Sequence, residues 1–176
     1  MNATRLALSG ILVTAAVAGV AMYYLQVYGF YEEASGDAAA PILLTLPDGT
    51  TETLPTQDLR TIERDSSPIS FRACFTTAEP LDTLAARAQP YDDATPRTGP
   101  GWFDCFDAAA IGAALESGEA RAFLSVKDIR YGIDRIVAVF PDGRGYAWQD
   151  INPCGEVVFD GNPPPEGCPP VPERAD

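Results

Sequence analysis

Two carboxylates near the middle of the chain have residue types and spacing that suit a catalytic or binding site. Asp104 and Asp107 lie three residues apart, beside Trp102 and two phenylalanines, just before an apolar pattern with helical period. Paired carboxylates carry acid and base catalysis in glycosidases, and carboxylate oxygens also bind metal ions. The cluster of Trp102, Asp104 and Asp107 is therefore a candidate for a carbohydrate, metal or hydrolytic site.

A structural explanation for the same residues is simpler. Aspartate is a preferred N-cap because its side chain accepts hydrogen bonds from the unpaired amides of the first helical turn. Asp107 occupies that position before residues 108–117. We expect Asp107 to cap this helix, Trp102 and Phe106 to pack into the core, and Asp104 to lie in solvent.

Most other catalytic classes lack their key residues in this chain. No histidine occurs among the 176 residues, which excludes triads with a histidine base. Neither a phosphate loop nor a kinase glycine loop is present. The cysteine spacings match no zinc site, and Asp92, Asp93 and Asp104 lack the EF-hand pattern. We therefore expect no metal, no cofactor and a role other than catalysis.

A second candidate site begins where one predicted strand ends and another starts. Arg130, Tyr131 and Arg135 bring two guanidinium groups and an aromatic ring together in an otherwise acidic chain. Planar donors and aromatic rings are common anchors at protein interfaces. The simpler alternative is that the arginines pair with nearby carboxylates and contribute little.

Four cysteines indicate two disulfides. An even number allows three connectivities, of which we predict Cys74 with Cys105 and Cys154 with Cys168. The second pair would close a short loop rich in glycine and proline, which has little apolar surface to bury. Such a bond contributes about 3 kcal/mol in the chain-entropy account. Because disulfides persist outside the cytoplasm and no CxxC motif occurs, we expect structural disulfides in an exported domain.

The chain carries no charged residue from Leu6 to Tyr28. As a helix these residues span about 35 Å, enough to cross the hydrocarbon core of a bilayer. A cleaved signal peptide is the alternative, since small residues at positions 19–21 resemble a cleavage site. The apolar run continues past them, however, and ends in tyrosines that suit the headgroup region. We expect residues 6–28 to remain as an anchor in the lipid bilayer.

Charge gives the anchor an orientation and excludes one class of partner. Arg5 precedes the apolar segment, and the next basic residue is Arg60. Basic residues stay on the cytoplasmic side, so we expect an inner-membrane protein with a periplasmic main domain. All 25 acidic residues and 11 of the 12 basic ones follow Tyr31, a formal charge of −14. That charge argues against nucleic acid and would steer a basic soluble partner toward the domain. We expect a membrane or periplasmic protein as the partner.

The rest of the chain has the length of one domain, and its patterns predict an α+β fold. We expect a mainly antiparallel sheet with two short helices. The predicted elements are a hairpin of residues 41–46 with 51–54, a half-buried strand at 69–76, a helix after Pro80, an exposed loop at 91–101, a helix at 108–117, and strands at 120–126, 133–140 and 146–148.

These elements place the domain boundaries. Residues 1–5 form the cytoplasmic end, 6–28 the transmembrane helix, 29–40 a juxtamembrane tether and 41–152 the periplasmic domain. Residues 153–176 contain seven of the sixteen prolines, and we expect an extension without regular structure that is tied by a disulfide.

Several phrases spread over the chain carry a resemblance to a known family. They are SFRACFT (70–76), GWFDCFDAA (101–109), IGAALESGEA (111–120), IRYGIDRIVAVFPDGRGYAW (129–148) and NPCGEVVFDG (152–161). The chain is similar in these to an uncharacterised alphaproteobacterial family of small proteins with one N-terminal membrane segment. Because that family has no known function, the resemblance implies no catalytic residue. Members are sometimes labelled histidine kinases, which a chain without histidine or a nucleotide motif contradicts.

These observations favour a binding role. We expect an accessory, assembly or interaction subunit of an envelope or respiratory complex. The alternative is a periplasmic ligand-binding or carboxylate-based enzyme domain that uses Trp102, Asp104 and Asp107.

Overall fold

The computed structural model describes residues 3–172, which form two units that divide between Glu32 and Glu33. The first unit is helix α1 (Ala3–Tyr24), continued by one π-helical turn, η1 (Leu25–Gly29). The most apolar 18-residue stretch of these 27 residues has a mean hydropathy of 2.0, and none of its residues is buried within the protein. Such a helix is long and apolar enough to cross a membrane, and it fits a single-pass anchor or a signal sequence.

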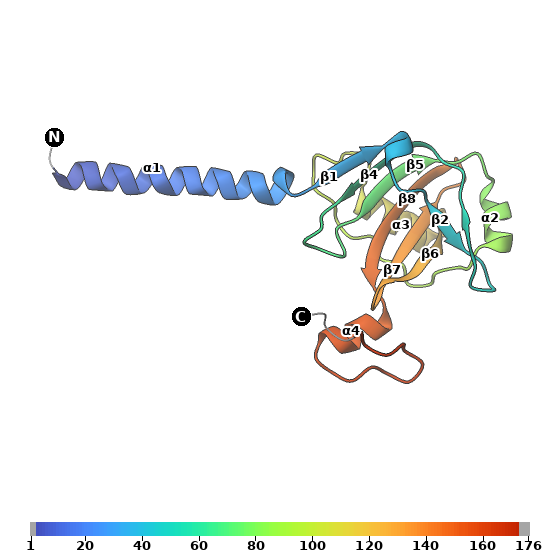
Figure 1. Ribbon diagram of the computed structural model, residues 1–176. Helices are drawn as coiled ribbons and strands as arrows, with labels where there is room; N and C mark the ends of the chain where they lie inside the picture. Colours follow the sequence, from blue (N-terminus) through green and yellow to red (C-terminus); the bar gives the residue numbers. More distant parts are fainter. Residues whose placement is uncertain (1–2, 173–176) are drawn as a thin grey trace. The chain divides into compact units, whose positions relative to one another are not determined.

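The second unit is an α+β domain built on one large sheet (Figure 1). Its six strands lie in the order β1-β4-β5-β8-β7-β6, and the pairings from β4 to β6 are antiparallel. Their bounds are Glu32–Ser35 (β1), Gln57–Glu63 (β4), Arg72–Thr76 (β5), Arg121–Arg130 (β6), Ile133–Val139 (β7) and Arg144–Ile151 (β8). The predicted α+β class and antiparallel sheet are thereby confirmed.

One face of the sheet is covered by a hairpin and a short helix. The hairpin joins β2 (Leu43–Thr45) to β3 (Thr51–Thr53), and the helix is α2 (Leu81–Arg87). Ile42, Leu44, Leu54 and Leu84 pack there against sheet residues that include Ala73, Phe75 and Val137. These side chains form the main core.

The other face is covered by α3 (Ala108–Ser117) and the segment that precedes it (Figure 1). Phe106 packs edge-on against Tyr146 and Trp148, with ring centroids 6.0 and 6.3 Å apart. Trp148 is fully buried. Strand β5 is therefore enclosed on both sides, and the prediction of a half-buried strand was wrong because the residue period gives no sign of this second layer.

Both predicted disulfides form. Cys74 of β5 joins Cys105, which lies just before α3, and Cys154 joins Cys168 in the C-terminal segment. Cys74 lies on the sheet face opposite Phe75, as the alternation of the strand predicts.

Two predicted boundaries need correction. Residues 29–40, expected as a tether, contain strand β1 and the short helix η2 (Gly36–Ala38). Ala34 packs against the main core, so the sheet begins before residue 41. Residues 153–176, expected without regular structure, begin with helix α4 (Pro153–Phe159). Pro153 suits the first turn of a helix, and the side chain of Asn152 caps it.

The long edge strand β6 is partly covered. Pro90 forms a bridge with Phe123, Tyr91 donates its amide to the Ala122 carbonyl at 3.0 Å, and Leu124 donates to Gln89 at 2.9 Å. The Thr45 hydroxyl donates to the Ser125 carbonyl at 2.9 Å. In residues 122–125, backbone groups that would otherwise form an open edge are therefore satisfied within the domain.

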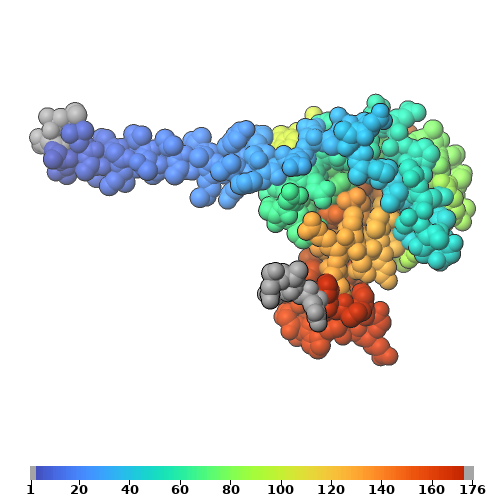
Figure 2. Space-filling view, in the orientation of Figure 1, coloured from blue at the N-terminus to red at the C-terminus, as the bar shows by residue number. Residues whose placement is uncertain are grey.

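Helix α4 rests on the β6–β7 turn through two glycines. Gly132 has a φ of 73°, and a Cβ placed there would lie 2.4 Å from the Cα of Gly155. A Cβ on Gly155 would lie 2.2 Å from the carbonyl oxygen of Gly132. The two backbones therefore touch, and α4 with the loop after it protrudes beyond β7 (Figure 2).

We predict that Gly155→Ala destabilises the domain by about 1–3 kcal/mol, the usual cost of overpacking. Chemical denaturation of the full chain in detergent micelles measures the change. Gly112→Ala is the matched control, because a Cβ on this helical glycine would meet only Pro96, at 3.8 Å. The control should be neutral or stabilising by up to about 1 kcal/mol. Equal losses of unfolding free energy in the two variants would contradict the close packing of Gly155 against Gly132.

Candidate functional site

The structure gives Asp107 the capping role. Its Oδ1 accepts hydrogen bonds from the amides of Ala109 and Ala110, both at 3.0 Å. Gly118 ends the helix with a φ of 74°, a left-handed conformation that favours glycine. The predicted helix, its cap and its last residue are all confirmed.

Asp104 and Trp102 have other surroundings. The Asp104 side chain is 81% exposed and lies 3.3 Å from the guanidinium of Arg60. The same guanidinium lies over the ring of Phe103, 5.2 Å from its centroid, while Trp102 meets that ring edge-on at 6.2 Å. An exposed ion pair contributes little to stability. The three predicted cluster residues thus have different partners.

The second predicted cluster does not form one open patch. Arg130 is exposed, but the Tyr131 hydroxyl donates to the Pro169 carbonyl at 3.2 Å. Arg135 lies over the ring of Phe71, 3.8 Å from its centroid. Burial lowers the pKa of Arg135, and the charge of Glu63 opposes this shift. Tyr131 and Arg135 therefore hold parts of the domain together, which leaves Arg130 as the exposed member.

A groove that sequence analysis missed lies beside α3. It is bounded by the segment 90–96, by α3 and by the first residues of β6, and its volume is about 770 Å³. We call it the α3 groove. Small residues dominate its lining, chiefly Ala94, Ala108, Ala109, Gly112, Ala113 and Ala122. A second hollow of about 440 Å³ lies near the same helix and is lined by residues that include Asp107 and Ala110. Trp102 and Asp104 line neither hollow.

One wall of the α3 groove is fixed to the sheet at both ends. Its first residues pair with β6 through Gln89, Pro90 and Tyr91, as described above. At its far end Arg97 forms an ion pair with Asp150 of β8, with 2.5 Å between the guanidinium and carboxylate atoms. The loop predicted to be exposed at 91–101 is thus partly packed against the sheet, although Asp92 and Asp93 do lie in solvent.

The other wall, α3, is fixed to β5. The Cys74–Cys105 disulfide ties the chain two residues before the Asp107 cap. Arg72 lies on the same face of β5 and is 4% exposed. It holds the end of the first wall, because it donates to the carbonyls of Arg97 and Thr98 at 2.7 and 3.1 Å. Both walls of the groove are therefore held to the sheet by covalent and charge-assisted bonds, which leaves the groove preformed.

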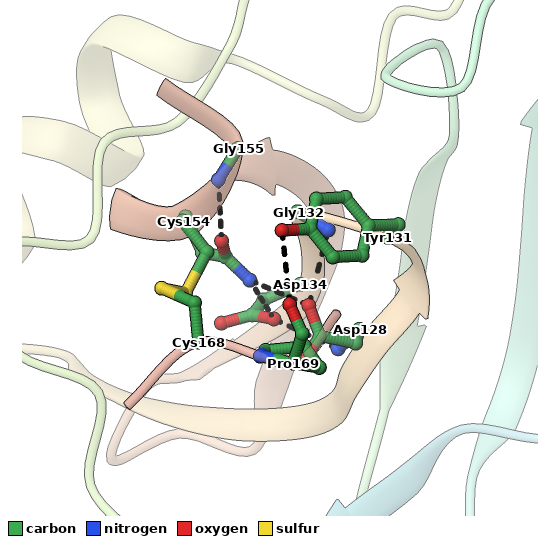
Figure 3. Close-up of a disulfide and its surroundings, with 9 residues drawn as sticks. Asp128, Tyr131, Gly132, Asp134, Cys154, Gly155, Cys168 and Pro169 are labelled. Carbon is green, nitrogen blue, oxygen red and sulfur yellow. Dashed lines mark hydrogen bonds between the residues drawn. A yellow bond between two sulfur atoms is a disulfide. The ribbon is translucent and has the colours of Figure 1, made fainter. Parts of the chain in front are cut away.

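A buried polar network lies between the sheet and α4 (Figure 3). Asn152 donates to the carboxylates of Asp128 and Asp134 at 3.0 and 2.8 Å. Asp134 also accepts from the Asp128 amide at 2.9 Å, and Asp128 accepts from the Gly132 amide at 3.1 Å. The bonds join the β6–β7 turn to the cap of α4, beside the Cys154–Cys168 disulfide. Among residues 3–172, no group of three or more acidic or cysteine side chains is placed to hold a metal ion.

Tyr91 connects this network to the α3 groove. Tyr91 lines the groove, and its hydroxyl donates to Asp134 at 3.4 Å. Burial, and then the negative charge of Asp134, raise the pKa of Tyr91. The sequence signal for the network was available in Asp128, Gly132 and Asp134, which surround a turn, and in Asn152 before a proline. It could not reveal that these side chains meet.

Comparison with known proteins identifies a family. The model of a family of unknown function (DUF6446) matches residues 42–169. No curated protein and no solved structure matches the chain.

We predict that Asp107→Ala lowers the free energy of unfolding by about 0.5–2 kcal/mol, because two amides of the first turn of α3 lose their acceptor. The matched control is Asp104→Ala, which removes only an exposed ion pair and should change stability by about 1 kcal/mol or less. Denaturant titrations of both variants test this. If Asp104→Ala were the more damaging substitution, the roles assigned to the two carboxylates would be reversed.

The raised pKa of Tyr91 predicts that the free energy of unfolding falls at alkaline pH. A folded-state pKa above the ordinary value of 10.0 means that the unfolded chain loses this proton first as the pH rises. The contribution of the Tyr91 proton to the free energy of unfolding is complete below pH 10 and declines above it. Tyr91→Phe should therefore reduce the decline in unfolding free energy between pH 8 and pH 11. An identical pH dependence in the wild type and the variant would contradict the assigned environment.

Proposed function

The chain belongs to the DUF6446 family, and we propose that it is a membrane-anchored periplasmic binding subunit with an accessory or assembly role in an envelope or respiratory complex. The observation that carries the proposal is a preformed groove in a rigid, disulfide-tied domain that follows a helix able to cross a membrane. A groove whose walls are already fixed loses little conformational entropy when a partner binds.

The proposed location rests on two independent features. Disulfides persist in oxidising compartments such as the periplasm, and the domain holds two of them. Arg5 lies before the apolar segment, whereas no lysine or arginine occurs between Phe30 and Leu59. The positive-inside tendency then directs the domain away from the cytoplasm.

We propose binding in preference to catalysis because the candidate carboxylates have structural partners. Asp107 accepts two amide hydrogen bonds, and Asp104 pairs with Arg60. Catalytic carboxylate pairs face one another across a shared substrate site. Asp107 lines the second hollow, whereas Asp104 lines neither of the two hollows described above.

The location predicts the redox state of the cysteines. In intact cells, alkylation with a large maleimide before any reduction should leave all four cysteines unmodified, whereas reduction under denaturing conditions should expose four thiols. A Cys74→Ser/Cys105→Ser variant is the control and should expose two. Four reactive thiols before reduction, in chain extracted from the membrane, would contradict an exported domain.

The binding role predicts a stoichiometric partner. Affinity purification of the full chain in mild detergent, followed by mass spectrometry, should recover one protein in constant ratio. Asp104→Ala/Asp107→Ala should recover it equally well, because neither carboxylate is assigned to binding. Recovery of the chain alone would overturn the proposal, and loss of the partner from a folded double variant would restore the alternative site.

A further inference from the structure

The small residues that line the α3 groove leave open space beside the helix. Ala109, Gly112 and Ala113 present the smallest side chains to it. A Cβ on Gly112 would meet nothing closer than Pro96, at 3.8 Å. A volume of about 770 Å³ lies within the range of roughly 300–1,000 Å³ that is typical of ligand pockets. The groove is therefore large enough for a bulky apolar side chain.

The charges around the groove are mostly of one sign. Asp92, Asp93 and Glu116 line it as exposed carboxylates, and Arg121 is the basic residue among the lining side chains. Arg121 lies 3.9 Å from Asp82, outside the groove lining, so its charge is partly offset. The whole chain carries a net charge of −13. Such a rim attracts cations and repels acidic partners.

Size and charge together select one kind of occupant, and this inference rests on the proposed binding role. We propose that the α3 groove docks a basic segment of a partner protein. The segment inserts one bulky apolar side chain between α3 and residues 90–96, and its lysines or arginines lie against Asp92, Asp93 and Glu116. The apolar side chain supplies contact area, and the rim supplies selectivity for basic flanks.

Synthetic peptides test the proposal without knowledge of the partner. The probe is a fluorescein-labelled peptide, GKKGWGKKG, titrated with the full chain in uncharged detergent micelles and followed by fluorescence anisotropy. Its controls replace the tryptophan by glycine or all four lysines by glutamate. We expect at least tenfold weaker binding for each control peptide. Equal affinity of all three peptides, or no binding of the first, would overturn the proposal.

Matched variants locate the binding site. Ala109 lines the α3 groove and the adjacent Ala110 lines the second hollow. Both are exposed on α3, so Ala109→Trp should weaken binding at least tenfold and Ala110→Trp should leave it unchanged. Melting curves with intact disulfides confirm that each variant is folded. Equal effects of the two variants would overturn the assignment to this groove.

A second pair of variants separates the rim from the overall charge. Asp92→Lys/Asp93→Lys and Asp160→Lys/Glu166→Lys change the net charge by the same amount, but only the first pair lines the groove. We expect at least tenfold weaker binding for the first pair and less than a threefold change for the second. If both double variants lost a similar amount of peptide affinity, the effect would come from the net charge of the chain. The specific role of Asp92 and Asp93 would then be overturned.

The outcomes distinguish this inference from the proposed function. If affinity purification recovers a stoichiometric partner that Ala109→Trp does not release, the groove assignment fails and the binding role stands. If the wild type recovers no partner, the proposed function itself fails. If sedimentation shows a dimer of the chain that Ala109→Trp dissociates, the occupant is a second copy and the basic partner is excluded.

Discussion

The buried guanidinium of Arg72 is the interaction on which one whole side of the domain depends. It donates to carbonyl oxygens of its own strand region, Ile69 and Phe71, and to those of Arg97 and Thr98 in the segment that crosses the sheet. Buried charge is costly unless it is hydrogen-bonded, so the bonds to Arg97 and Thr98 hold the crossing segment against β5. The neighbouring Cys74–Cys105 disulfide then fixes where α3 begins. The α3 groove follows from this attachment, because it lies between the attached segment and the helix.

The sequence predicts those helices and hairpins that are determined by capping and turn residues within the element itself. The helix at 108–117 was predictable because Asp107 caps it and Gly118 ends it, and the 41–54 hairpin because of its turn residues. The sequence does not predict strand β4, and it predicts a tether where β1 lies, since neither strand shows a clear period and both depend on pairing with neighbours. Helix α4 was missed among prolines, although Asn152 and Pro153 are typical of a helix start.

The candidate sites show the same division. Asp107 was predictable as a cap from its position in the chain. Arg135 looked like an interface residue because nothing in the sequence places it over Phe71. The α3 groove was not predictable at all. Its lining comes from α2, the 90–96 segment, α3 and β6. Alanines at helical spacing predict only a helix, and the sequence does not show whether space lies beside them.

The covering of β6 gains importance for a chain held at a membrane surface, as proposed. Copies confined to a plane meet far more often than the same number of copies in solution. Two sheets with open edges would then pair edge to edge and extend into aggregates. Here residues 89–91 and Thr45 cover residues 122–125 of the long edge, and β1 offers only four residues at the opposite one. Crowding in two dimensions would therefore concentrate the exposed groove without also promoting strand exchange between neighbours.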